Sequence, residues 1–401
     1  MNYTKNIWIL LLLLAPFFQS CSDDDGDDPQ PINEKLVSYE KAQVISETFA
    51  EQAAQIAGYG DFTEFIENDT DVYAIIYKTT YQGNEIQASG LVSVPKLSDP
   101  SPLIMVHRGT IFSDTETPSE NPLSPYALFG TLGYISFTPD LIGFGASKDV
   151  FHPYFEYEHT VDASLDMLVA VKELLNELEI TYDPTLFITG YSQGGYSAMA
   201  TLKGMEDSSD DFGVEIGGVA AGAGGYDINK VMDEIVMEDT YSSPGFLTFV
   251  VQSYHETYNW DTPYSEYFNE PYAQRIAGGL LEGANTQEEV NAQLSTELDT
   301  LFTAAFLAAV REGTEEQVSG AMATNSVADW APQSPLRLYH SPNDESVPYA
   351  SSTFTYDLMV SNGAEDIDFK EIGGDNHADA AAYMLLEGYL WIESRRAELI
   401  P

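Results

Sequence analysis

A serine flanked by glycines is the feature of this chain best suited to chemistry. Residues 190–195 read Gly-Tyr-Ser-Gln-Gly-Gly and follow the apolar run 186–189. A sharp turn from strand to helix strains the backbone of its serine, and glycine is needed two residues to either side because a side chain there would collide with the turn. The pattern predicts that Ser192 is a nucleophile raised above a sheet. The backbone N–H of Gln193 would face the oxyanion that forms when a carbonyl is attacked.

A serine hydroxyl is a poor nucleophile at neutral pH and needs a base. For a serine on this kind of turn, the acid and then the histidine follow later in the chain, which leaves His340 and His377. His377 is the predicted base because it lies in a glycine-containing loop before the last expected helix, where an imidazole can fold back over the nucleophile. His340, at the end of the preceding expected strand, is expected to support the neighbouring loop.

The acid is expected in the turn-rich segment 341–348, which follows the strand that ends at His340. Asp344 is the predicted acid, and Glu345 and Asp375 are the alternatives. A carboxylate at this place would fix the tautomer of His377 and stabilise the imidazolium that forms during the reaction.

A second oxyanion donor is expected in the loop after the apolar run 103–106, which reads His-Arg-Gly-Thr. The backbone N–H of Gly109 or of Thr110 would point toward Ser192 from that position.

The elements that must position these residues follow from hydrophobic patterning. Two alternating segments around a Gln-Gly-Asn turn at 82–84 predict an antiparallel hairpin, and short apolar runs further on predict buried parallel strands. The eight expected strands cover 72–77, 86–95, 103–106, 134–137, 186–189, 217–221, 336–340 and 367–372. Helices are expected at 37–56, 161–178 and 378–393. Strands that alternate with helices predict a mostly parallel sheet flanked on both sides.

Residues 229–333 show helical patterns, such as 288–294 and 301–310, without a convincing strand. A segment this long cannot be one loop, so we expect a helical subdomain. Its first part is rich in aromatic side chains, which would line a pocket or pack the subdomain onto the sheet. The expected division is a signal peptide at 1–20, a flexible acidic tether at 21–33, a core in two parts at 34–228 and 334–401, and the helical subdomain at 229–333.

The N-terminus resembles a bacterial lipoprotein signal. A lysine precedes the apolar run 7–14, which is too short for a typical transmembrane helix and is typical of a secretory signal peptide. Cys21 is the only cysteine, so no disulfide can form within the chain. Residues 18–21 resemble a lipobox, which implies cleavage before Cys21 and acylation of that residue. The acidic residues that follow resemble an export signal of some Gram-negative lipoproteins. We therefore expect an exported protein, held by lipid on Cys21 at the outer membrane or cell surface.

The charge of the chain restricts its partners. It has 64 acidic and 16 basic residues, a formal net charge of -48. This excess excludes nucleic-acid binding, makes polyanionic substrates a poor fit, and favours a monomer through self-repulsion.

Residues from about 72 to the C-terminus resemble the α/β-hydrolase superfamily, and within it the secretory lipase type. The resemblance is carried by the serine motif, the loop at 109–110, the helical segment before the acid, and a Pro-Asp pair with two following glycines at 139–145. It implies an α/β-hydrolase fold with a helical lid inserted after the sixth strand, and hydrolysis of carboxylic esters through an acyl-enzyme without metal or cofactor. Arg108 departs from the His-Gly sequence usual in this group, which leaves the second oxyanion donor open. Asp140 precedes the serine and is expected to have a structural role.

The class of substrate stays open at this point. A small neutral or apolar ester would use the same residues as an acetyl or feruloyl ester on polysaccharide. An exopeptidase of the same fold, or a catalytically silent binding protein on this scaffold, is also compatible. Reaction of Ser192 with a fluorophosphonate and turnover of proline-linked amides would separate these alternatives.

Overall fold

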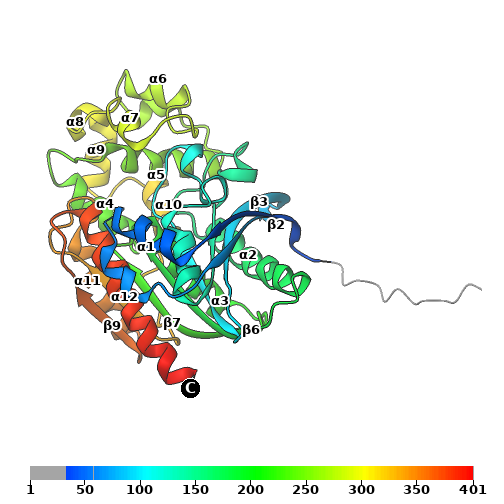
Figure 1. The fold of residues 1–401 in the computed structure, drawn as a ribbon. Helices are drawn as coiled ribbons and strands as arrows, with labels where there is room; N and C mark the ends of the chain where they lie inside the picture. Colours follow the sequence, from blue (N-terminus) through cyan, green and yellow to red (C-terminus); the bar gives the residue numbers. More distant parts are fainter. Residues whose placement is uncertain (1–32, 57, 401) are drawn as a thin grey trace, which may run out of the picture. The chain divides into compact units, whose positions relative to one another are not determined.

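The computed structural model describes residues 33–56 and 58–400 (Figure 1). The predicted signal peptide, Cys21 and the predicted tether up to residue 32 lie outside the described residues. Within the described part of the chain, no helix has both the length and the apolar character needed to span a membrane.

The core is a nine-stranded sheet in the order β1-β2-β3-β5-β4-β6-β7-β8-β9. Strands β1 to β3 and the pairing of β3 with β5 are antiparallel, and all pairings from β5 to β9 are parallel. The strands are β1 Leu36–Ile45, β2 Thr70–Tyr81, β3 Asn84–Pro95, β4 Ser101–His107, β5 Ile135–Pro139, β6 Tyr182–Tyr191, β7 Glu215–Gly222, β8 Leu336–His340 and β9 Ile367–Glu371. The predicted α/β class and the mostly parallel sheet are therefore confirmed.

The N-terminal region corrects the expected strand number. The helix expected at 37–56 exists only in its second half, as α1 Glu47–Ile56, and the first half is the edge strand β1. Only Leu36 and Ile45 of β1 are buried, so its apolar residues do not mark a buried face. Hydrogen bonds to β2 hold β1 in the sheet. Since β2 lies further along the chain, the pattern of residues within β1 does not reveal this pairing. The sheet thus has nine strands instead of eight.

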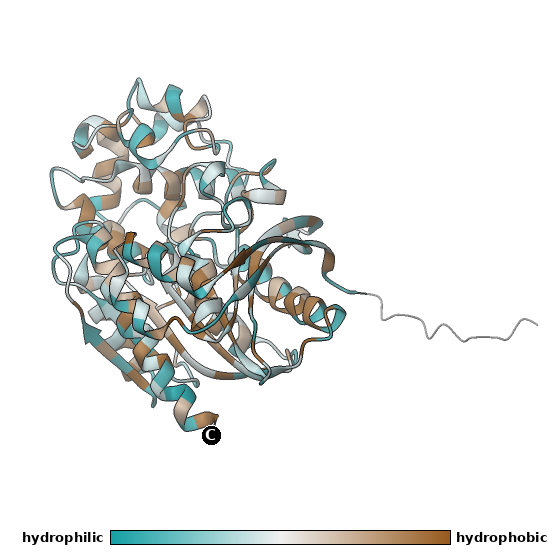
Figure 2. Cartoon of the chain, in the orientation of Figure 1, coloured by the Kyte–Doolittle hydropathy of each residue, from teal (hydrophilic) through white to brown (hydrophobic). Residues whose placement is uncertain are grey.

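Helices cover both faces of the sheet, and a hydrophobic core lies on each face. Because successive side chains of a strand point to opposite faces, the residues of β4 divide between the two cores. Leu103 and Met105 belong to the core beneath α2 Tyr157–Glu177, α3 Gln193–Asp207 and α11 Tyr349–Ser361. Ile104 and Val106 belong to the opposite core, beneath α1 and α12 His377–Leu399. In Figure 2 the inner strands are largely hydrophobic, and the outer helices mix hydrophilic with hydrophobic residues.

The segment between β7 and β8 is helical. It follows the seventh strand and not the expected sixth, because β1 adds one strand at the start of the sheet. Its helices are α4 Ile228–Val236, α5 Pro244–Thr257, α6 Tyr272–Ala277, α7 Gln287–Asn291, α8 Leu298–Leu301, α9 Ala304–Arg311 and α10 Gln317–Asn325. The helix expected at 301–310 is divided at Phe302, which lies between α8 and α9. Figure 1 shows α5 to α9 gathered at one end of the sheet. Residues of α4 and α5 line part of the pocket at Ser192.

Candidate active site

Ser192 lies on a tight turn between β6, which ends at Tyr191, and α3, which begins at Gln193. Its backbone has φ 60 and ψ -125, a strained conformation for a residue with a side chain. The N–H of Ser192 donates to the carbonyl of Gly222 at the end of β7 (2.9 Å), so the neighbouring strand holds the turn in place. The hydroxyl is therefore presented at the carboxyl end of the sheet.

The glycines around Ser192 are required by close backbone contacts. A Cβ added at Gly190 would lie 2.3 Å from the carbonyl oxygen of Gly194, and one added at Gly194 would lie 2.3 Å from the carbonyl oxygen of His107. A Cβ on Gly195 would meet the backbone of β7 equally closely. The turn can form only because these side chains are absent.

The structure brings the three predicted residues into one hydrogen-bonded chain. His377 Nε2 lies 2.9 Å from Ser192 Oγ, and His377 Nδ1 lies 2.6 Å from Asp344 Oδ2. Since the carboxylate can only accept, Nδ1 carries the proton and Nε2 is free to accept from the serine hydroxyl. His377 is the first residue of α12 and not a loop residue; the Asn376 side chain caps this helix by accepting from the N–H of Asp379 (2.9 Å).

The carboxylate of Asp344 is fully buried and accepts four hydrogen bonds of 3.2 Å or less. Oδ1 accepts from the N–H groups of Ser346 (2.9 Å) and Val347 (2.8 Å), and Oδ2 accepts from His377 and from His340 Nε2 (3.2 Å). Burial would raise the pKa of Asp344, but the hydrogen bonds from His340 and His377 outweigh it and hold this pKa well below the ordinary value. Asp344 therefore remains a carboxylate at every pH at which the protein would work.

His340 and the two alternative acids have other places. His340 Nε2 donates to Asp344 and to the carbonyl of Val347 (3.1 Å), as expected for a residue that supports this loop. Glu345 accepts from the backbone N–H of His377 (2.9 Å), and Asp375 is exposed. Of the three candidate carboxylates, Asp344 is the one that faces the imidazole.

The expected oxyanion donors come from the start of α3 and from the loop that follows β4, where Gly109 approaches the carbonyl of Tyr191. Gln193 begins α3, so its N–H is one of the free donors of a helix N-terminus. The N–H of Gly109 points to the hydroxyl of Tyr126 (3.4 Å), whereas the N–H of Thr110 has no partner among residues 33–56 and 58–400. This difference favours Thr110 as the second donor.

Three neighbours of the site are not identified by motif. The hydroxyl of Tyr191 donates to the carbonyl of His377 (2.8 Å), and His152 contacts the side chain of Gln193 (2.8 Å). Tyr191 occupies a variable position of the serine motif, and His152 lies in a loop without any pattern, so only the fold could find them. The sequence shows Arg108 as a departure from a family pattern. The contacts of its side chain are known only from the structure. Asp140 accepts from Ser89 (2.6 Å), away from the histidine, in keeping with a structural role.

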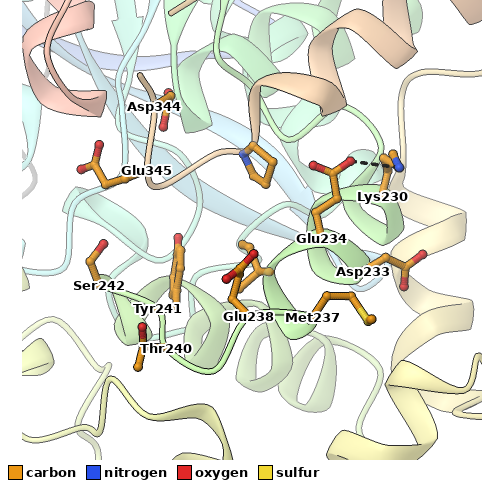
Figure 3. A pocket seen from close by; sticks show the side chains of 12 residues that line it. Lys230, Asp233, Glu234, Met237, Glu238, Thr240, Tyr241, Ser242, Asp344 and Glu345 are labelled. Carbon is orange, nitrogen blue, oxygen red and sulfur yellow. Dashed lines mark ion pairs between the residues drawn. The ribbon is translucent and has the colours of Figure 1, made fainter. Parts of the chain in front are cut away.

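Two cavities meet at the site. A narrow apolar pocket of about 50 Å³ contains Ser192 and is lined by residues of α4 and α5. An open cleft of about 740 Å³ lies next to it and is lined by acidic side chains, among them Asp233, Glu234, Glu238 and Glu345 (Figure 3).

Two residues, Ile235 and Tyr241, line both cavities and so form the partition between them. The hydroxyl of Tyr241 donates to the carbonyl of Ser346 (2.8 Å), which ties the partition to the loop that carries Asp344.

Comparisons with known proteins agree with this fold. A family model described as secretory lipase matches residues 126–398, more than half of the chain. No curated protein matches. A solved Legionella pneumophila protein assigned as a hydrolase is 26% identical, with a TM-score of 0.82 over 90% of this chain and 98% of its own. The rice cell wall degrading esterase LipA from Xanthomonas oryzae is 20% identical (TM-score 0.79, 92% and 98% covered), and Candida antarctica lipase A is 16% identical (0.68, 92% and 83%). The last two share the fold.

Proposed function

Because this chain belongs to the secretory lipase family and is a serine hydrolase of carboxylic esters, we propose that it forms its acyl-enzyme on Ser192. His377 acts as base and then as acid, and Asp344 orients it. The proposal is carried by one observation, the unbroken hydrogen-bonded path from Ser192 Oγ through His377 to Asp344. In the first step Oγ attacks the carbonyl carbon of the ester while Nε2 takes the hydroxyl proton.

The following steps use the same groups in reverse. The negative oxygen of the tetrahedral intermediate accepts from the N–H groups of Gln193 and Thr110. When the intermediate collapses, the bond to the alcohol breaks and His377 returns its proton to the leaving oxygen. Water then attacks the acyl carbon with His377 again as base, which releases the carboxylic acid and restores Ser192. The depressed pKa of Asp344 keeps it ionised opposite the imidazolium throughout.

The apolar pocket supports a short acyl chain as the acid part of the substrate. A cavity of about 50 Å³ is small, so we take an acyl chain of about four carbons as the longest that it would hold. The adjoining cleft would take the alcohol part. Its carboxylates would repel an alcohol part that carries a negatively charged group. The proposed substrate is therefore a neutral short-chain ester.

A polysaccharide-linked ester is the second candidate, and the open cleft favours it. The cleft carries the exposed hydroxyl side chains of Thr240 and Ser242 beside its carboxylates, groups suited to hydrogen bonds with a sugar. Hydrolysis of acetylated xylan at a higher rate than of simple acetate esters would favour this alternative.

The experiment that tests the proposal joins labelling with turnover. The purified protein should hydrolyse nitrophenyl butyrate and react with a fluorophosphonate probe, and Ser192→Ala should abolish both. The matched control is Ser197→Ala. Ser197 is a buried serine of α3, the helix that follows Ser192, and this variant should retain both activities. Hydrolysis that survives in Ser192→Ala would exclude Ser192 as the nucleophile.

We further propose a lid and an anchor. The helices of 229–333 would act as the lid, a role supported by the residues of α4 and α5 that line the pocket at Ser192. The family indicates an exported protein. The lipobox-like sequence supports acylation of Cys21 and a membrane as partner, at the outer membrane or cell surface, and the high negative charge supports a monomer. A Cys21→Ser variant should leave the membrane fraction and lose acyl label; retention of both would contradict the anchor.

A further inference from the structure

Arg108 is a buried side chain with an unusual set of partners. It follows β4 and is 0% exposed. Nε and Nη2 donate to the carbonyl of Asp140 (3.0 and 2.7 Å), and Nη1 donates to the carbonyl of Gly109 (3.0 Å) and to Oε1 of Gln193 (3.1 Å). The guanidinium carbon lies 4.7 Å from the centre of the Phe144 ring. Backbone and amide oxygens thus receive its hydrogen bonds.

These bonds are directional contacts and not an ion pair. The nearby carboxylate of Asp140 instead accepts from the Ser89 hydroxyl (2.6 Å) and from the N–H of Ser119 (2.9 Å). A planar guanidinium holds several donors in fixed directions, so it sets the relative positions of the groups that it contacts. Here it joins the loops that follow β4 and β5 to the first residue of α3.

The side chain of Gln193 is fixed from both ends. Its Oε1 accepts from Arg108, and its Nε2 lies 2.8 Å from Nε2 of His152. His152 Nδ1 lies 2.6 Å from the carbonyl of Ile142, so Nδ1 carries the proton and Nε2 accepts from Gln193. Burial, with Arg108 nearby, lowers the pKa of His152 to about 3, so this pattern holds at neutral pH.

The bond to Gly109 acts on the other side of the site. The carbonyl of Gly109 and the N–H of Thr110 belong to one planar peptide group, so a donor that fixes the oxygen also fixes the direction of the N–H. A hydrogen bond to the carbonyl further polarises the peptide and strengthens the N–H as a donor. One nitrogen, Nη1 of Arg108, therefore contacts the peptide group that carries the Thr110 N–H and the side chain of Gln193, the residue whose backbone N–H is the other proposed donor.

We propose that Arg108 is a positioning residue that fixes the two oxyanion donors, the N–H groups of Thr110 and Gln193, relative to each other. The proposal rests on the function proposed above, since it needs an oxyanion near Ser192. The arginine that interrupts the family's His-Gly pattern thereby has a role in the reaction without contact to the substrate.

The test is Arg108→Met, which keeps an apolar stem and removes the donors. We expect kcat for nitrophenyl butyrate to fall by roughly 10- to 100-fold with KM nearly unchanged, because misaligned donors affect the transition state alone. The inhibition constant of a trifluoromethyl ketone, which forms the oxyanion on Ser192, should rise by the same factor. Circular dichroism and a melting curve establish that the variant is folded.

Two further variants keep the proposal open to refutation. Gln193→Met removes one contact of Arg108 and leaves the contact with Gly109, so it should lower kcat less. Adding it to Arg108→Met should have little further effect, because the contact between the two side chains is already lost in Arg108→Met. Gln193→Met carries the test if Arg108→Met does not fold. Arg396→Met, which removes another arginine stacked on an aromatic ring, is the matched control and should leave kcat unchanged.

The possible outcomes separate the two proposals. A folded Arg108→Met enzyme with normal kcat, or a kcat loss without weaker ketone binding, would overturn the positioning role. An equal kcat loss in Arg396→Met would also overturn it, since the effect would then be general. A wild-type protein that neither hydrolyses esters nor reacts with the fluorophosphonate would instead refute the function on which the positioning role rests.

Discussion

The partition between the two cavities predicts how the enzyme limits acyl length. Each methylene buried in the apolar pocket contributes about 0.8 kcal/mol, or about 4-fold in kcat/KM, as long as there is room for it. We therefore expect kcat/KM to rise from acetate to butyrate and then to stop rising, because the pocket of about 50 Å³ is full at about four carbons.

The variant Ile235→Ala should remove this limit. Ile235 is 6% exposed and lines both cavities, so its truncation opens the pocket into the cleft of about 740 Å³. Three further methylenes correspond to about 2.4 kcal/mol, so esters of about seven carbons should gain up to about 60-fold relative to butyrate. Longer chains should be accepted as well, since they can run out into the cleft.

The control is Leu247→Ala, which removes as many carbons from a residue that lines the apolar pocket alone. It should move the optimum by up to about three carbons and then impose a new limit. Kinetics with nitrophenyl esters from two to twelve carbons measure both variants, with melting curves to account for lost stability. A wild-type kcat/KM that rises through the octanoate, or an Ile235→Ala profile like that of the wild type, would refute the assignment of this pocket.

Three other changes test different parts of the structure. Asp344→Asn should lower kcat about 10³- to 10⁴-fold at all pH values, because an amide favours the His377 tautomer that cannot accept from the serine; a loss below 10-fold in steady-state assays would contradict the assigned acid. Gly194→Ala should lose fluorophosphonate labelling, since its Cβ would lie 2.3 Å from the carbonyl oxygen of His107; labelling at the normal rate would show that the turn tolerates it. Burial and neighbouring carboxylates raise the pKa of Asp162 to about 6, so its ionisation destabilises the fold above that pH, whereas below about pH 3 it is mostly neutral in folded and unfolded chains alike. Asp162→Asn should therefore raise the free energy of unfolding at pH 8 by about 1 kcal/mol after allowance for its partial exposure, and with it the melting temperature, and should do so much less at pH 4, as differential scanning calorimetry would measure.

The parallel part of the fold is predictable from sequence because its signals are local. The runs at β4, β6 and β8 are short, continuous and apolar, as buried strands require. Strand β1 is different, since its stability comes from pairing with β2 and its side chains are mostly exposed. Nothing in its own residues distinguishes it from the start of a helix.

The same contrast holds within the site. Ser192 has a motif with a steric reason, and His377 and Asp344 follow from chain order and from the loops that carry them. Tyr191 and His152 have contacts that depend on folded geometry alone. The choice between Gly109 and Thr110 likewise depends on the folded structure, in which the N–H of Gly109 donates to the hydroxyl of Tyr126.

The separation of the reacting groups along the chain has a consequence for biosynthesis. Ser192 and His377 are 185 residues apart, and the whole helical segment is made between them. A growing or still unfolded chain therefore holds a serine without a base, and hydrolytic activity can begin only after the last helix has docked on the sheet. If the chain is exported before it folds, this order of assembly keeps the esters of the producing cell from reaction with Ser192.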